Sequence, residues 1–155
     1  LLLRIIIHCS ATPEGKNFTA KDINSWHINR GWKSIGYHFV ILLDGTIEVG
    51  RPLDQIGAHT LGFNKDSIGI CYIGGLDKDG KTPKDTRTPE QIKSMHWLVE
   101  ELTRKHPSII EVKGHRDYSP DKNGDGIIEP WEWLKACPCF DVISEFIQYV
   151  KNKLS

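Results

Sequence analysis

The chain lacks an excess of charge of either sign, since 20 Lys and Arg residues balance 20 Asp and Glu residues among 155. A general nucleic-acid-binding protein needs a basic face that displaces counterions from phosphates, so the balance argues against that class. Long apolar runs are also missing. The run at residues 1–7 is too short to span a bilayer, and it has neither the basic flank nor the cleavage site of a signal peptide. We therefore expect a soluble protein that binds neither nucleic acid nor a membrane.

Cysteine is scarce, and the short metal-binding spacings CxxC and HExxH do not occur. Of the four cysteines, Cys9 and Cys71 lie in apolar, strand-like runs, where a buried free thiol is the usual state. A domain of this length buries a sufficient core without covalent cross-links. We therefore expect no disulfide framework.

Strand and helix patterns alternate along the chain. Apolar, β-branched runs predict strands at residues 3–8, 67–73 and 112–115, and Asp44-Gly45 predicts the turn of a hairpin over residues 36–49. Helices are predicted at residues 19–30, 88–106 and 141–154, the first two opened by Thr19 and Thr88 as N-caps. The sum is one α/β domain over residues 1–155, a single mixed β-sheet flanked by helices, with the site on loops at strand ends.

Three candidate metal ligands stand at the edges of apolar segments: His8, His115 and Cys137. Two imidazoles and a thiolate suit zinc, and three protein ligands leave a fourth position open for water, which indicates catalysis. No short spacing ties the three together, and a histidine at the end of an apolar strand is more often a hydrogen-bonded core residue. From the residues alone, both interpretations remain open.

A second metal pattern covers residues 121–132, which match the calcium-binding loop D-x-[DN]-x-[DN]-G-x5-E. Its oxygen ligands would be Asp121, Asn123, Asp125, the Ile127 carbonyl and a bidentate Glu132. The pattern predicts calcium, although a turn leading into a short helix at Pro130 would need the same residue types. Pro120 excludes a normal entering helix, so a full EF-hand is not expected.

Several segments occur in one order along nearly the whole chain: His8-Cys9-Ser10-Ala11-Thr12, Gly36-Tyr37-His38-Phe39, Ala58-His59-Thr60 with Gly62-Phe63-Asn64, Ser67-Ile68-Gly69-Ile70-Cys71 with Gly74-Gly75, Gly114-His115-Arg116-Asp117, and Lys135-Ala136-Cys137-Pro138-Cys139-Phe140-Asp141. Together they resemble the zinc-dependent N-acetylmuramoyl-L-alanine amidases. The similarity is to the branch that contains phage lysozyme-type amidases and peptidoglycan recognition proteins. The resemblance implies that branch's fold and hydrolysis of the amide between N-acetylmuramic acid and L-alanine in peptidoglycan.

Carried over position by position, the resemblance implies that His8, His115 and Cys137 bind zinc. It also implies that Tyr37 and Lys135 are catalytic. It further implies that His59 and Asn64 line the substrate groove. Lys135 is suited to stabilise the developing oxyanion, and Tyr37 to orient the zinc-bound water and relay its proton. The expected partners are peptidoglycan or muropeptides. We expect a monomer, located in bacterial or phage cytoplasm, that acts on the cell wall.

Two other functions stay open. A binding-only peptidoglycan recognition domain is disfavoured by Cys137, because such domains usually lose the thiolate ligand. A calcium-gated interaction module with structural zinc is disfavoured by the open coordination position and by Lys135. Among the remaining side chains, His38 and His59 could either pack in the core or contact the substrate, and both interpretations stay open. We interpret the others as structural or surface groups: His27, His96, His106 and the thiol Cys139.

Overall fold

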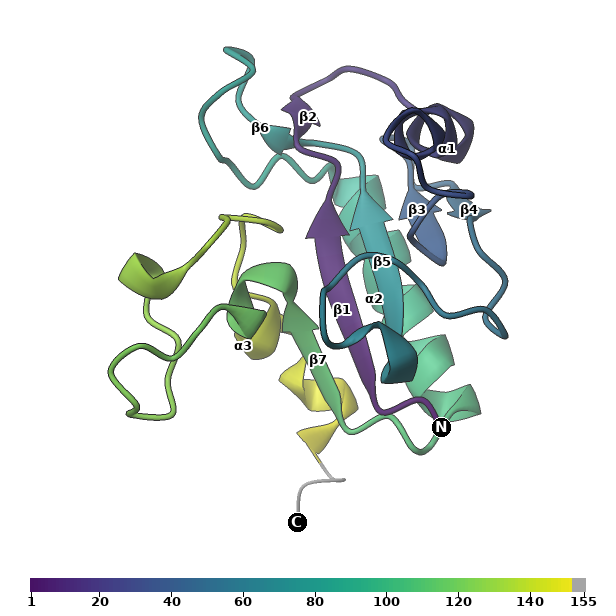
Figure 1. The fold of residues 1–155 in the computed structure, drawn as a ribbon. Coiled ribbons are helices and arrows are strands. Elements are labelled where there is room, and N and C mark those ends of the chain that lie inside the picture. The colour runs from purple at the N-terminus through teal and green to yellow at the C-terminus, as the bar shows by residue number, and fades with distance from the viewer. Residues whose placement is uncertain (152–155) are drawn as a thin grey trace.

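The computed structural model describes residues 1–151, whose centre is a mixed five-stranded sheet in the order β4-β3-β5-β1-β7 (Figure 1). The two central strands pair in parallel with each other, and β3 and β7 extend the sheet in parallel on either side. Only the hairpin partner β4 runs antiparallel. The strand bounds are β1 Arg4–Cys9, β3 Phe39–Ile41, β4 Ile47–Val49, β5 Ser67–Tyr72 and β7 Glu111–Gly114. The predicted mixed α/β sheet is confirmed.

Helices cover both faces of this sheet. Alternate side chains of β1 and β5, such as Ile7 and Ile70, pack on one face against α2 (Pro89–Lys105) and α3 (Val142–Phe146). The opposite face of β5 carries Cys71, which packs with the side chains of α1 (Ala20–Asn29). No helix within residues 1–151 combines the length and the apolar character that crossing a bilayer requires.

Both predicted N-caps are present, and each belongs to a capping box. The Thr19 hydroxyl accepts from the Asp22 amide, and the Thr88 hydroxyl accepts from the Gln91 amide, with each third residue reaching back to its N-cap. The buried Gln91 amide group also donates to the carbonyls of Ile41 and Ile73 at 3.1 and 3.0 Å. One residue therefore both opens α2 and anchors it to the sheet.

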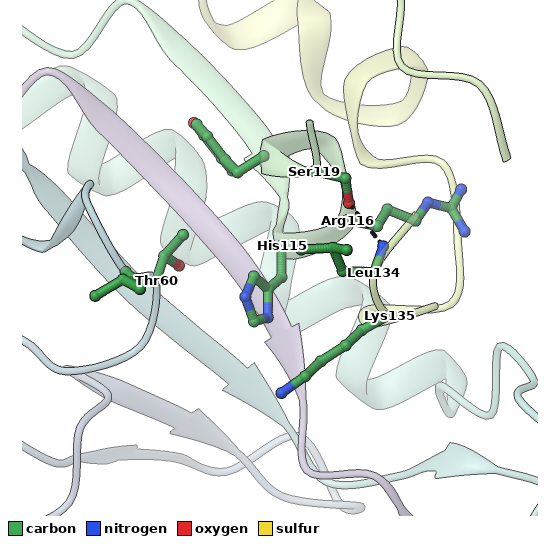
Figure 2. Close-up of a pocket in the computed structure, with 8 residues that line it drawn as sticks. Thr60, His115, Arg116, Ser119, Leu134 and Lys135 are labelled. Atoms are coloured by element: carbon green, nitrogen blue, oxygen red, sulfur yellow. Dashed lines mark hydrogen bonds between the residues drawn. The ribbon is translucent and has the colours of Figure 1, made fainter. Parts of the chain in front are cut away.

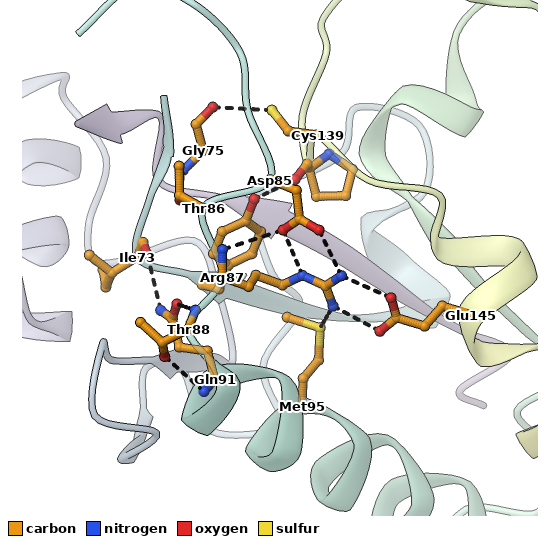
Figure 3. A network of polar contacts seen from close by, with 12 residues as sticks. Ile73, Gly75, Asp85, Thr86, Arg87, Thr88, Gln91, Met95, Cys139 and Glu145 are labelled. Atoms are coloured by element: carbon orange, nitrogen blue, oxygen red, sulfur yellow. Dashed lines mark hydrogen bonds and ion pairs between the residues drawn. The ribbon is translucent and has the colours of Figure 1, made fainter. Parts of the chain in front are cut away.

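The buried side chain of Arg87 links the segment before α2 to α3 (Figure 3). Its guanidinium pairs with the carboxylates of Asp85 and Glu145 and lies 3.4 Å from the centre of the Phe140 ring. The Tyr72 hydroxyl donates to the Pro138 carbonyl at 2.6 Å. These contacts attach the residues that follow Cys137 to the core. Cys137 therefore has a defined position.

The closing helix is shorter than predicted. α3 ends at Phe146 and a 3-10 turn (Ile147–Tyr149) follows, while residues 152–154 of the predicted helix lie outside the described residues. The tighter turn lets the Tyr149 hydroxyl meet His96 Nδ1 at 2.8 Å while Val150 stays buried. A small second sheet, β2 (Thr12–Pro13) with β6 (Gly75–Leu76), was not predicted.

Candidate metal centre

The parallel register of the central strands brings His8 and His115 together. Ile7 of β1 lies opposite Gly114, the last residue of β7, so the histidines that follow them, His8 and His115, lie at the same end of the sheet. The centres of the two rings are 4.7 Å apart. Two residues that are distant in sequence thus become neighbours through strand pairing alone.

Cys137 reaches the same point from the loop before α3. The Cys9 amide donates to Cys137 Sγ at 3.2 Å, and the Arg116 amide donates to the Cys137 carbonyl at 2.8 Å. Gly114 makes this approach possible, because a Cβ there would stand 2.6 Å from the Pro138 ring. The potential ligand atoms of His8, His115 and Cys137 all lie within 4.8 Å of one another.

Burial keeps both imidazoles uncharged. It lowers the pKa of His8 well below its usual value, with further lowering by His59, His115 and Lys135. It also lowers the pKa of His115, again with a contribution from Lys135. Neutral imidazoles offer lone pairs to a metal, and two of them with a thiol fit the ligand preference of zinc. Three donors also leave a fourth tetrahedral position open.

A pocket of about 200 Å³ opens beside His115 (Figure 2). The side chain of Lys135 extends along it toward the His115 ring. Its lining residues are Thr60, Leu61, His115, Arg116, Tyr118, Ser119, Leu134 and Lys135. Sequence reasoning missed the exposed Leu61 and Leu134 at this pocket, and only their proximity to the His59 and Lys135 motifs could have indicated them.

Tyr37 lies against the metal centre, with its ring centre 5.1 Å from that of His8. Burial raises its pKa well above the ordinary value, and the thiols of Cys71, Cys137 and Cys9 add to the effect. The phenol therefore keeps its proton at neutral pH. It is suited to donate a hydrogen bond rather than to act as a base.

His59 and Asn64 do not line the pocket beside His115, and their contact with the substrate stays a prediction. The buried His59 ring packs behind His8, with its Nδ1 2.8 Å from His8 Nε2. Burial, followed by the effect of His38, lowers the pKa of His59 to about 3. Asn64 Oδ1 accepts from the amides of His59 and Thr60, both at 2.9 Å. The partly exposed Asn64 thus holds the buried His59 in place beside His8.

The loop at residues 121–132 does not support the predicted calcium site. Asp121 accepts from the amides of Gly124 and Gly126, and Glu132 accepts from those of Lys122 and Glu129. Asn123 Oδ1 and Asp125 Oδ1 likewise accept from loop amides, while Ile127 is exposed. Glu129 contacts both Asp125 and Glu132, which raises the pKa of Glu129 to about 7. Within residues 1–151, however, no three acidic side chains of this loop bring ligand atoms as close together as His8, His115 and Cys137 do. The turn-forming explanation accounts for the contacts seen.

Comparison with known proteins agrees with this arrangement. A family model described as N-acetylmuramoyl-L-alanine amidase matches residues 3–127. The endolysin of Enterobacteria phage T3 is 38% identical over 138 residues, which cover 89% of this chain and 81% of that protein. The structure of N-acetylmuramoyl-L-alanine amidase LysC from Clostridium intestinale URNW has a TM-score of 0.69 at 29% identity, covering 99% of this chain and 85% of the other.

Peptidoglycan recognition proteins have the same fold. A structure of tracheal cytotoxin bound to the ectodomain complex of peptidoglycan recognition proteins LCa and LCx has a TM-score of 0.68 at 25% identity, covering 95% of this chain and 81% of the other. The family match spans most of the sequence, and the phage relative covers nearly all of it. The chain therefore belongs to the N-acetylmuramoyl-L-alanine amidase family, in the branch of phage endolysins and peptidoglycan recognition proteins.

Proposed function

We propose that this protein hydrolyses the amide bond between N-acetylmuramic acid and L-alanine in peptidoglycan, with zinc held by His8, His115 and Cys137. The observation that carries the proposal is the convergence of these three side chains at the edge of a pocket that also contains Lys135. Membership of the amidase family supports the reaction, and the binding of tracheal cytotoxin by structural relatives supports a muropeptide substrate. We infer that residues 1–155 act as one catalytic domain, and as a monomer.

Each proposed role follows from the chemistry of a side chain. Zinc held at this site would supply a bound water of pKa near ~7 and polarise the scissile carbonyl. Lys135 is a flexible cation at the pocket beside His115, where a developing oxyanion would be stabilised. Tyr37, which stays protonated, would orient the attacking water by donating a hydrogen bond.

The product chemistry tests the proposal directly. Purified peptidoglycan digested with the protein should yield stem peptides that carry a free L-alanine amino group, as identified by mass spectrometry. A chelator should stop the reaction, and added zinc should restore it. New reducing sugar ends without new amino groups would show a glycosidase. Binding of muropeptides without cleavage, in protein loaded with zinc, would show a recognition domain instead.

A further inference from the structure

His59 is the buried neighbour that touches the proposed zinc ligand His8 most closely. The two rings meet edge to face, with centres 4.8 Å apart and His8 Nε2 2.8 Å from His59 Nδ1. Such a nitrogen–nitrogen contact needs one proton between the two atoms. The other ring nitrogen of His59, Nε2, lies 3.2 Å from the Ser67 hydroxyl.

Two proton arrangements satisfy this contact, and they differ in what they leave on His8. If His8 Nε2–H donates to His59 Nδ1, then His8 Nδ1 carries a free lone pair and His59 Nε2–H can donate to Ser67. If His59 Nδ1–H donates to His8 Nε2, then the remaining His8 nitrogen is protonated and cannot bind a metal. Only the first arrangement lets a neutral His8 act as a ligand.

The surroundings of His59 hold its ring in one position. Asn64 Oδ1 anchors the backbone on both sides of the His59–Thr60 peptide bond, by the two hydrogen bonds already described. Gly69 of β5 leaves room for the ring, because a Cβ there would lie 2.6 Å from His59 Cδ2. The Thr60 hydroxyl lies 3.0 Å from His59 Nδ1 and 3.3 Å from His8 Nε2, so it is within hydrogen-bonding distance of both nitrogens.

We propose that His59 is a positioning residue of the metal centre, which accepts the Nε2 proton of His8 and so presents His8 Nδ1 to zinc. Asn64 and Ser67 keep His59 in place and in the accepting tautomer. Metal ligands commonly donate their second ring nitrogen to such a partner, which fixes the ring and strengthens the ligand. This inference rests on the proposed zinc site, and it gives His59 and Asn64 a role within that site.

The first test needs no variant. Nitrogen-15 NMR of the histidine rings in the zinc-free protein at pH 7.5 reports the tautomer of His8. We expect a protonated Nε2 that is coupled to His59 and an unprotonated Nδ1. A protonated Nδ1 on His8 would overturn the proposal.

The second test measures zinc affinity by competition with a chelator. His59→Phe keeps a ring in the space beside Gly69 but removes the acceptor, so we expect affinity to fall about 10- to 100-fold. Asn64→Ala, which frees the two amides that hold His59, should give a smaller fall in the same direction. His96→Phe is the matched control: it removes a partly buried imidazole that bonds to Tyr149 and Glu145 and stacks on Phe146, with no contact to His8.

The outcomes separate this inference from the proposed function. Unchanged affinity in a folded His59→Phe, as judged by circular dichroism, would refute the positioning role while leaving zinc binding intact. An equal loss in His96→Phe would also refute it, because general destabilisation would then explain the effect. Failure of the unmutated protein to bind zinc would refute the proposed function itself.

Discussion

The two sides of the candidate metal centre are built in different ways. His8 and His115 follow from paired parallel strands, and His8 is 1% exposed with hydrogen-bond partners in the core. Lys135 lies instead at the end of a mostly exposed segment, residues 120–136, whose inner contacts are largely turns between its own side chains and backbone. Strand pairing thus gives the metal centre one rigid side, which carries His8 and His115. The loop adds the Lys135 cation without disturbing the sheet.

Cys137 lies where these two sides join, so replacing it should have the largest effect. Cys137→Ser exchanges a soft thiolate for a poor hydroxyl ligand, and we expect zinc affinity to fall by more than about 100-fold and cleavage to reach background. Equilibrium dialysis against zinc and release of stem peptides measure the two effects. Retention of wild-type zinc affinity would show that the strand side binds the metal without the loop.

Lys135→Ala should separate the loop's chemistry from metal binding. Loss of a group that stabilises the oxyanion lowers turnover by ~10²-fold or more, while zinc content stays that of the unmutated protein. Turnover on defined muropeptides and metal analysis of the same sample provide the readouts. Loss of zinc equal to that in Cys137→Ser would contradict this division of roles.

Glu132 tests how the loop is held. Its buried carboxylate accepts from the Lys122 and Glu129 amides, so Glu132→Ala should lower the melting temperature and reduce activity more mildly than Lys135→Ala. We expect the same losses with and without millimolar calcium, because the carboxylate acts on backbone amides. A melting temperature that calcium raises in the unmutated protein but not in Glu132→Ala would restore the calcium interpretation.

Acid should lower the stability of the zinc-free fold through its buried imidazoles. Burial lowers the pKa of His59 to about 3 and that of His27 to about 4, against about 6.5 in an unfolded chain. Between these values the unfolded state binds more protons, so stability is full above about 6.5 and falls as pH falls. Melting of the zinc-free protein should move to lower temperature from pH 7 to pH 5. No change in melting over that interval would contradict this.

Features that depend on neighbours in sequence were predicted well. The Thr19 and Thr88 caps, the hairpin turn at Asp44-Gly45 and the strands on either side of the site follow from local residue patterns, and all are present. The small β2–β6 sheet was missed because it joins two dipeptides far apart in the chain. The predicted calcium loop shows the converse, since a matching local pattern did not bring three of its carboxylates into a metal-type group within residues 1–151.

The sequence by itself determined which side chains are available for chemistry: two imidazoles, a thiol and an amine at the ends of predictable elements. Tertiary structure decided how they are used. The pairing of β1 with β7 places His115 beside His8, and the approach of Pro138 to Gly114 brings in Cys137. His59 became a partner of His8 only through a buried contact between residues 51 positions apart. Local patterns set propensity and capping, whereas burial, register and proton sharing arise only when distant segments pack together.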